Sequence, residues 1–262
     1  YHYIVPEIED DTVISLDSEK LIGEYEEARK LGIKTKPVVI GPYTMLKLCR
    51  YVGSKNAEDF ADDVAEAYRQ LIAECDEENV EWLQFDEPSL VRDMDDDDKA
   101  LFHRVYDRVF ADRADCKILL QTYFGDVRDV YEDIINMPFA GIGLDFIEGK
   151  QTGQLIDRYG FPGDKVLFAG LVNGKNIWRN HYDKTLNVVG QLRDKKIDVV
   201  LSTSCSLLHV PYTLKQETKL SQDYLRFFAF AEEKLIELSE LSALAESYNY
   251  TELEAYHKNQ EL

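Results

Sequence analysis

The sequence predicts an α/β protein built around a mainly parallel β-sheet. Three observations support this: short apolar runs rich in β-branched residues recur, amphipathic helical patterns lie between them, and polar residues follow their ends. The runs begin roughly 25 to 45 residues apart, which is too far for hairpins and suits strand–helix–strand crossovers. The six predicted strands are residues 37–40, 82–85, 117–121, 141–145, 165–169 and 198–202.

A series of such units in a chain of 262 residues predicts a TIM-type (β/α)8 barrel, a fold that typically takes about 250 residues. Because six strands are found, we expect them to be strands three to eight, with the first βα units missing. Tyr1-His2-Tyr3 would then be the end of strand two. The chain starts without methionine, inside an apolar and aromatic segment, so we expect a piece of a longer protein.

Amphipathic patterns fill the gaps between the strands. Residues 18–31 carry an apolar stripe that Gly32 can end as a helix C-cap. Residues 58–79 carry a similar stripe that includes Cys75. Cys49 also lies on an apolar stripe, and we expect both thiols to be inert and to lie in the core. The sequence contains neither a glycine-rich dinucleotide fingerprint nor a P-loop, which argues against the common nucleotide-binding folds.

The C-terminal part predicts one long helix after Ser221, which becomes Glu-rich and loses its apolar stripe after about Ser247. We therefore expect a barrel domain over residues 1–235, incomplete at its N-terminus. Residues 236–262 are expected to be a helical tail or an interdomain linker.

The charge of the chain limits its partners. Fifty acidic and thirty basic residues give a formal net charge of -20, which repels phosphate backbones and anionic lipids, so we expect neither nucleic acid nor membrane as a partner. The four cysteines have no CxxC spacing, and no apolar run approaches the roughly 20 residues that span a bilayer. A cytoplasmic location is expected. A barrel that lacks two strands has open edges, which a homodimer or upstream residues would cover.

The segment Trp82–Leu90 (WLQFDEPSL) is an apolar run that stops at two carboxylates and a proline. Adjacent charges fit where a buried strand emerges into a cavity or water, so Asp86 and Glu87 indicate the C-terminal mouth of a strand. Neighbouring strand residues point to opposite faces, so we expect one carboxylate to face a pocket and the other to anchor a loop. A helix cap is an equally good interpretation of the Asp-Glu-Pro turn.

Other strand ends also carry polar or reactive residues, and in a barrel these would converge on one pocket. We predict no catalytic residue in this chain. The candidates for the barrel mouth are Asp86, Glu87, Tyr123, Asp145, Asn173, Arg179, Cys205 and His209.

Cys205 and His209 could form a thiolate–imidazole pair, as a nucleophile or as metal ligands. With Asp145 they could make an improvised zinc site, although zinc usually has a fuller set of cysteine and histidine ligands. Pro211 argues against a regular helix that would place both on one face. We favour a polar rim without metal and keep Cys205 as a weak metal candidate.

Six segments resemble the cobalamin-independent methionine synthases, in the order and spacing of the N-terminal half of that family. They are YHYIVPE (1–7), KPVVIGPYT (36–44), WLQFDEPSL (82–90), LLQTYFG (119–125), AGLVNGKNIWR (169–179) and SCSLLHVPYTLKQETKL (204–220). The resemblance implies a methyltransferase that moves a methyl group from 5-methyltetrahydrofolate polyglutamate to homocysteine, in methionine biosynthesis. The expected partner is the catalytic C-terminal barrel of the same polypeptide.

The resemblance also implies where the metal lies: in this family the C-terminal barrel holds the catalytic zinc on His, Cys, Glu and Cys. Here Thr122–Gly125 falls where that barrel has its His-x-Cys, Asp145 near its glutamate and Cys205 near its last cysteine. Tyrosine and glycine do not replace imidazole and thiolate, so no zinc is expected in this chain. The family also has a basic segment and a lysine that help bind the glutamate tail of the folate. Both lie before the region that matches Tyr1, so the resemblance carries neither over to a residue of this chain.

The resemblance therefore implies a fragment that is inactive by itself, while zinc activates the homocysteine thiol elsewhere. One alternative is a stand-alone barrel enzyme with its own pocket at Asp86, Asp145, Cys205 and His209. Another is a non-catalytic scaffold that docks the catalytic barrel.

Overall fold

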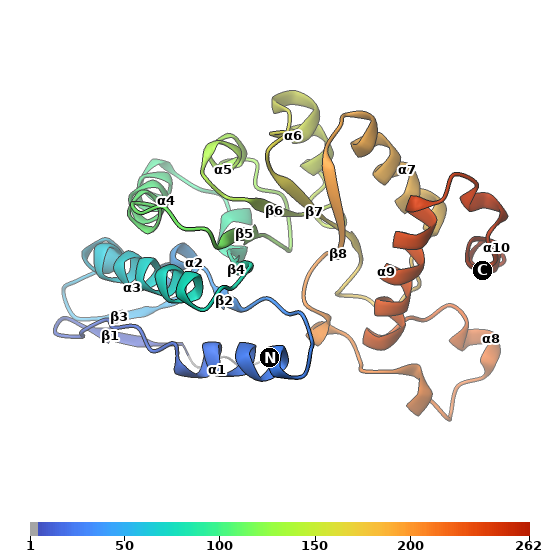
Figure 1. The fold of residues 1–262 in the computed structure, drawn as a ribbon, viewed down its shortest axis with the longest axis horizontal. Helices are drawn as coiled ribbons and strands as arrows, with labels where there is room; N and C mark the ends of the chain where they lie inside the picture. Colours follow the sequence, from blue (N-terminus) through green and yellow to red (C-terminus); the bar gives the residue numbers. More distant parts are fainter. Residues whose placement is uncertain (1–4) are drawn as a thin grey trace. The chain divides into compact units, whose positions relative to one another are not determined.

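All six predicted strands are present in a computed structural model, which describes residues 5–262 (Figure 1). The predicted strand end at Tyr1–Tyr3 lies outside the described residues. The strand order in the sheet is β2-β4-β5-β6-β7-β8, and the pairs β2–β4, β4–β5 and β7–β8 are parallel. The predicted α/β class is confirmed. The strands are β2 (Val38–Ile40), β4 (Trp82–Asp86), β5 (Lys117–Gln121), β6 (Gly141–Asp145), β7 (Val166–Val172) and β8 (Asp198–Thr203).

Helices occupy every crossover between consecutive strands of this sheet. The α-helices are α1 (Glu19–Lys30), α2 (Pro42–Leu48), α3 (Ala57–Glu77), α4 (Asp96–Val109), α5 (Tyr131–Asn136), α6 (Thr152–Tyr159), α7 (Tyr182–Asp194), α8 (Gln222–Leu225), α9 (Ala231–Glu246) and α10 (Glu254–Gln260). Short 3-10 helices are η1 (Pro88–Val91), η2 (Leu207–His209), η3 (Leu214–Gln216) and η4 (Tyr250–Glu252). The chain divides into two compact units: residues up to 121 with 129–142 form the first, and residues 122–128 with 143–262 form the second.

The first unit contains a small parallel sheet that the sequence did not predict. It consists of β1 (Glu7–Glu9) and β3 (Arg50–Val52), and of the β1 side chains Ile8 is the buried one. Strand β1 has one buried side chain and β3 has none, so these three-residue strands carry too little apolar pattern to be recognised. The predicted helix before Gly32 is present, and Gly32 ends it with φ 72°.

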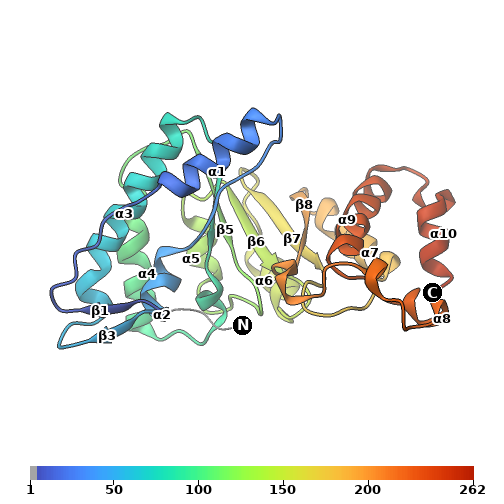
Figure 2. The ribbon, with the colours of Figure 1, turned by 90° about the horizontal axis from the view of Figure 1, so that it is seen from below.

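The core of the first unit lies between β4 and two long helices. Helices α3 and α4 run side by side (Figure 2). Alternation along β4 buries Leu83 and Phe85, and the Phe85 ring packs 5.4 Å from Tyr68 of α3. Cys75 is fully buried in α3, as predicted, whereas Cys49 is only half-buried, because it ends the short helix α2. The other side of β4 leaves Gln84 and Asp86 half-buried.

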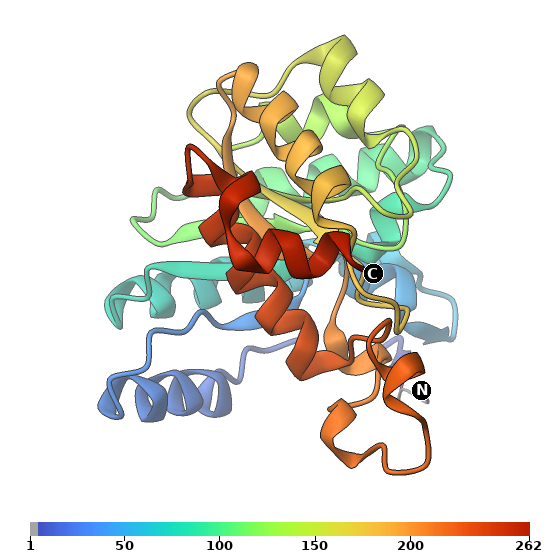
Figure 3. The ribbon, with the colours of Figure 1, turned by 90° about the vertical axis from the view of Figure 1, so that its right-hand side faces the viewer.

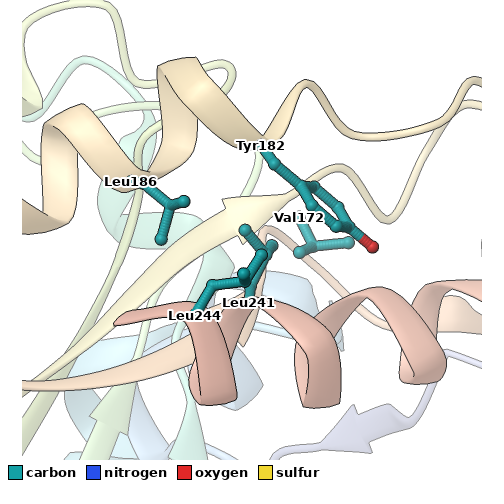
Figure 4. Packing of buried hydrophobic residues seen from close by; sticks show 5 residues of the cluster. All are labelled: Val172, Tyr182, Leu186, Leu241 and Leu244. Atoms are coloured by element: carbon teal, nitrogen blue, oxygen red, sulfur yellow. The ribbon is translucent and has the colours of Figure 1, made fainter. Parts of the chain in front are cut away.

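The core of the second unit joins β7 to α7 and α9 (Figure 3). All five residues of β6 are buried, as expected of a strand covered on both faces. A cluster of Val172, Tyr182, Leu186, Leu241 and Leu244 joins β7, α7 and α9, and Figure 4 shows these side chains converging. This cluster holds α9 against β7 and α7.

The prediction of one long helix after Ser221 is wrong. The chain forms α8, which has four residues, and then makes an antiparallel bridge between Phe228 and Trp178 before α9 begins. The Ala229 N–H donates to the Ile177 carbonyl at 2.7 Å, so backbone pairing with a distant segment replaces the helical bonds expected from the local pattern.

The expected domain boundary between residues 235 and 236 falls inside α9. Residues on both sides of it are buried, including Lys234 and Leu241. As a division into domains, this boundary stays a prediction. Across residues 5–262, no helix is long and apolar enough to cross a membrane.

We expect Leu241→Ala to lower the free energy of unfolding by about 2–5 kcal/mol, because it opens a cavity in the cluster under α9. Leu241 is 0% exposed, whereas Leu235 of the same helix is 57% exposed and supplies the matched control. Leu235→Ala should cost less than about 1 kcal/mol. Urea unfolding followed by circular dichroism measures both, and similar losses for the two variants would contradict the packing described for α9.

Candidate functional site

Glu87 follows β4 in the first unit and is fully buried. Its Oε1 accepts the Tyr43 N–H at 3.0 Å and the Tyr106 hydroxyl at 2.6 Å, and its Oε2 accepts the Thr44 N–H at 2.7 Å. The carboxyl group therefore caps the first turn of α2, where backbone N–H groups lack helical partners. Glu87 acts as an anchor between β4, α2 and α4.

Burial raises the pKa of Glu87 to about 7, although the hydrogen bonds from Thr44 and Tyr106 oppose this rise. Its neighbour Asp86 is half-buried and turns to the other face of β4, where Gln84 Nε2 donates to its Oδ1 at 2.7 Å. The two carboxylates thus have different surroundings and do not form an acid–base pair.

Asp145 ends β6 in the second unit and is 1% exposed. Its Oδ1 accepts the N–H groups of Ile147 at 2.7 Å and Glu148 at 2.9 Å, and its Oδ2 accepts that of Phe124 at 3.0 Å. Both oxygens of this carboxyl group therefore accept hydrogen bonds from the backbone. Burial nevertheless raises its pKa, because the loss of hydration outweighs these bonds.

Phe124 is the residue on which the loops around Asp145 meet. Its φ is 74°, a left-handed conformation that is rare for a bulky residue. The rings of Tyr123 and His209 lie edge-on to it at centroid distances of 4.7 and 5.3 Å, and Lys175 Nζ lies 5.3 Å from its centroid. Lys175 also pairs with Glu148 at 2.9 Å. We call Tyr123, Phe124, Asp145, Lys175 and His209 the strand-end cluster.

Cys205 adjoins this cluster through the turn that follows β7. Asn173 Oδ1 accepts the N–H groups of Lys175 and Asn176 at 2.8 and 3.1 Å, which closes the turn. A Cβ on Gly174 would lie 2.4 Å from the Cys205 carbonyl oxygen and 2.9 Å from its Sγ, so this close approach requires glycine.

The Cys205 thiol is 4% exposed, and burial raises its pKa to about 11. Its Sγ lies 3.8 Å from the Ser206 carbonyl oxygen, while the His209 ring contacts Phe124. A thiol with so high a pKa is a poor nucleophile at neutral pH.

The residues at this place do not fit zinc. Asp145 already accepts three N–H groups, and the loop at 123–125 offers a phenol and a glycine where zinc would need imidazole and thiolate. Among residues 5–262, no three His, Cys, Asp or Glu side chains are grouped so that they could hold a metal ion.

Arg179, the remaining candidate, lines a separate cleft in the second unit with Trp178 and Phe227. The structure thus places Tyr123, Asp145, Asn173, Cys205 and His209 close together in one unit, and Asp86 and Glu87 in the other. The single pocket shared by all eight candidates stays a prediction. The sequence analysis did not single out Phe124 or Lys175, and the available signal was an aromatic pair followed by glycine directly after a strand.

The strand order, the crossover helices and the polar strand ends define an α/β protein of the TIM-barrel type. A family model described as "Cobalamin-independent synthase, N-terminal domain" matches residues 1–197. The chain belongs to this family.

Two relatives with the name 5-methyltetrahydropteroyltriglutamate--homocysteine methyltransferase support this membership. One from Lactococcus lactis subsp. lactis (strain IL1403) is 52% identical over 242 residues, which cover 92% of this chain and 32% of the relative. One from Campylobacter jejuni subsp. jejuni (strain 81-176) is 46% identical over 262 residues, which cover 100% of this chain and 34% of the relative. The chain spans about a third of the length of these relatives.

Two solved structures share the fold at low sequence identity. One, from Listeria monocytogenes, is described as a vitamin-B12 independent methionine synthase; it has a TM-score of 0.66 and 17% identity, with 90% of this chain and 72% of that chain covered. The other, a B12-independent methionine synthase from Shewanella sp. W3-18-1, has a TM-score of 0.56 and 16% identity, with 85% and 68% covered.

Glu87 makes stability depend on pH. Because its folded pKa of about 7 exceeds the 4.5 of an ordinary glutamate, the folded chain keeps this proton through a pH range in which the unfolded chain loses it. Its contribution to the free energy of unfolding is therefore fully present below pH 4.5 and falls by about 3 kcal/mol as the pH rises to 7.

The difference in the free energy of unfolding between wild type and Glu87→Gln should therefore change with pH. Urea unfolding from pH 4.5 to 7.5 measures this slope. Glu24→Gln, on the exposed face of α1, is the matched control and should show no such slope. A pH-independent difference for Glu87→Gln would rule out the raised pKa.

Cys205 should react slowly with iodoacetamide. At pH 8 a pKa of about 11 leaves a thiolate fraction on the order of 100-fold below that of an ordinary cysteine. Peptide mass mapping of the folded chain should show the rate rising tenfold per pH unit up to pH 10, and the urea-unfolded chain provides the reference. Equal rates in the folded and unfolded chains would contradict the burial of this thiol.

Proposed function

We propose that this chain is the N-terminal domain of an enzyme that transfers a methyl group from 5-methyltetrahydropteroyltriglutamate to homocysteine. The observation that carries the proposal is the 46–52% identity to enzymes of that name over nearly the whole chain. Such identity over more than 240 residues accompanies a common fold and supports a common role within the longer enzyme.

The reacting groups of this enzyme belong to the part that lies outside the chain. The relatives are about three times as long, which leaves room for a second, catalytic barrel of the same polypeptide. Within residues 5–262, the carboxyl and thiol groups at the strand ends are engaged or un-ionised: Asp145 binds three N–H groups, and Cys205 has a pKa of about 11. Zinc and the activation of homocysteine are therefore assigned to the second barrel.

The role of this chain within the enzyme is structural support and docking. The strand-end cluster fixes the loops that follow β5, β6 and β7, so these loops form a rigid rim. A rigid rim provides a defined surface on which a catalytic barrel and an extended folate can be positioned.

The test is a chimera in which this chain replaces the equivalent third of the Lactococcus lactis relative. We expect the chimera to restore methionine-independent growth to a strain that lacks methionine synthase, because a matching N-terminal domain docks on the catalytic part. The relative without its N-terminal third and the chain without a partner are the two controls, and neither should support growth.

Purified proteins test the same proposal directly. The chimera should form methionine from labelled methyltetrahydropteroyltriglutamate and homocysteine, and the chain by itself with Zn²⁺ should not. A folded, soluble chimera without activity would refute the proposed role, and methionine formation by the isolated chain would refute the assignment of chemistry to the second barrel.

A further inference from the structure

A cleft in the second unit lies where the loop before α7, the segment after α8 and the end of α10 meet. It has a volume of about 270 Å³, and its walls include Trp178, Arg179, His181, Phe227 and Asn259. Aromatic walls with a few polar groups are typical of sites for small organic ligands. The residues that line it do not include any member of the strand-end cluster.

Backbone and amide hydrogen bonds fix the walls of this cleft. The Arg179 N–H donates to the Phe227 carbonyl at 2.9 Å. Asn259 joins the end of α10 to the start of α7 and the loop before it, because its Oδ1 accepts the Tyr182 N–H at 2.9 Å and its Nδ2 donates to the Asn180 carbonyl at 2.8 Å. A cleft held in this way needs little rearrangement to bind a ligand, which lowers the free-energy cost of binding.

Two aromatic side chains provide apolar surface at this cleft. Trp178 is 57% exposed, although its ring lies 5.2 Å from that of Phe228, and the half-buried Phe227 forms another part of the wall. An exposed indole on a fixed backbone can pack against a flat ring. Trp178 is fixed in this way, because its carbonyl accepts a hydrogen bond from buried Lys234 at 3.1 Å.

Arg179 places a positive charge at the cleft, in a strongly acidic chain. Several other arginines are paired with carboxylates, such as Arg104 with Asp62 at 2.8 Å and Arg108 with Glu66 at 3.1 Å. Within the described residues 5–262, neither the Arg179 guanidinium nor the His181 ring makes a hydrogen bond or an ion pair. His181 is also the N-cap of α7, where the helix dipole adds positive potential.

The acidic group behind this wall does not neutralise Arg179 by contact. Glu237 is 1% exposed, and its Oε1 accepts the Asn180 N–H at 2.9 Å. Burial raises the pKa of Glu237, whereas the Asn180 hydrogen bond and the positive charges of Lys234 and Arg179 lower it. The Arg179 guanidinium therefore remains available to an anion from solution, and a planar carboxylate matches its two parallel donors.

We propose that this cleft binds small aromatic carboxylates, with the carboxylate on Arg179 and the ring against Trp178 and Phe227. The site is independent of the proposed methyl transfer. Binding forms no covalent bond, and its specificity has two parts: the aromatic walls select a flat ring, and the unpaired guanidinium selects a negative charge.

The probe is 2-naphthoate, and isothermal titration calorimetry of the 262-residue chain measures its binding. We expect saturable binding of one molecule per chain, and Arg179→Gln should weaken it at least about tenfold through the loss of a charge-assisted bond. Arg158→Gln is the control, because it removes an arginine of the same unit that lies beside an aromatic ring, at 4.9 Å from the centroid of Tyr159, but does not line the cleft. This control should bind as tightly as wild type.

Two other ligands separate the charge from the ring. Neutral 2-naphthamide and non-aromatic cyclohexanecarboxylate should each bind at least about tenfold more weakly than 2-naphthoate. Trp178→Leu should weaken 2-naphthoate binding and leave cyclohexanecarboxylate binding unchanged. Circular dichroism and the unfolding midpoint confirm that each variant is folded.

Several results would overturn the proposal. They are the absence of saturation below about 10 mM 2-naphthoate, equal affinity for 2-naphthamide, and equal weakening by Arg158→Gln and Arg179→Gln. Binding of an acidic peptide without binding of 2-naphthoate would also overturn it and would identify a peptide-docking groove. Failure of the methyl-transfer chimera leaves this test unaffected, because it uses neither substrate.

Discussion

The structure of the second unit depends on one buried carboxyl group, that of Asp145. Its two oxygens accept three backbone N–H groups from the loops after β5 and β6, which fixes both loops at the ends of their strands. A buried carboxyl group is stable only when its oxygens have partners, so these bonds also determine where Phe124 and Glu148 lie. The left-handed φ of Phe124 is held by this arrangement.

Glu87 in the first unit illustrates the same use of a carboxyl group. It accepts two backbone N–H groups at the start of α2 and the Tyr106 hydroxyl, so it ties the N-terminus of α2 to the end of β4. In both units, an acidic residue directly after a strand serves the architecture. A position at the C-terminal end of a parallel strand is therefore not sufficient evidence of a catalytic role, even in a fold that places its active sites there.

Much of the fold could be predicted from the chain. The apolar runs of β4 and β6 indicated buried strands, because alternating or continuous burial leaves a local pattern in the sequence. Gly32 indicated a helix end, because glycine readily adopts the left-handed conformation that ends a helix. Strands β1 and β3 were missed, since each has three residues and is stabilised by pairing with the other across the sequence. Helix α9 begins later than predicted because Phe228 pairs with Trp178.

The candidate site, like the fold, was partly predictable from the sequence. The sequence by itself determined that Asp86, Glu87, Asp145 and Cys205 follow strands, that the charge is strongly negative, and which family the segments resemble, because these are local properties of composition and order. The tertiary structure decided what each group does. It shows that three N–H groups donate to Asp145, that Cys205 is buried, and that Arg179 makes no ion pair with a carboxylate among the described residues. Hydrogen-bond partners and burial come from segments distant in sequence, so no local pattern contains them.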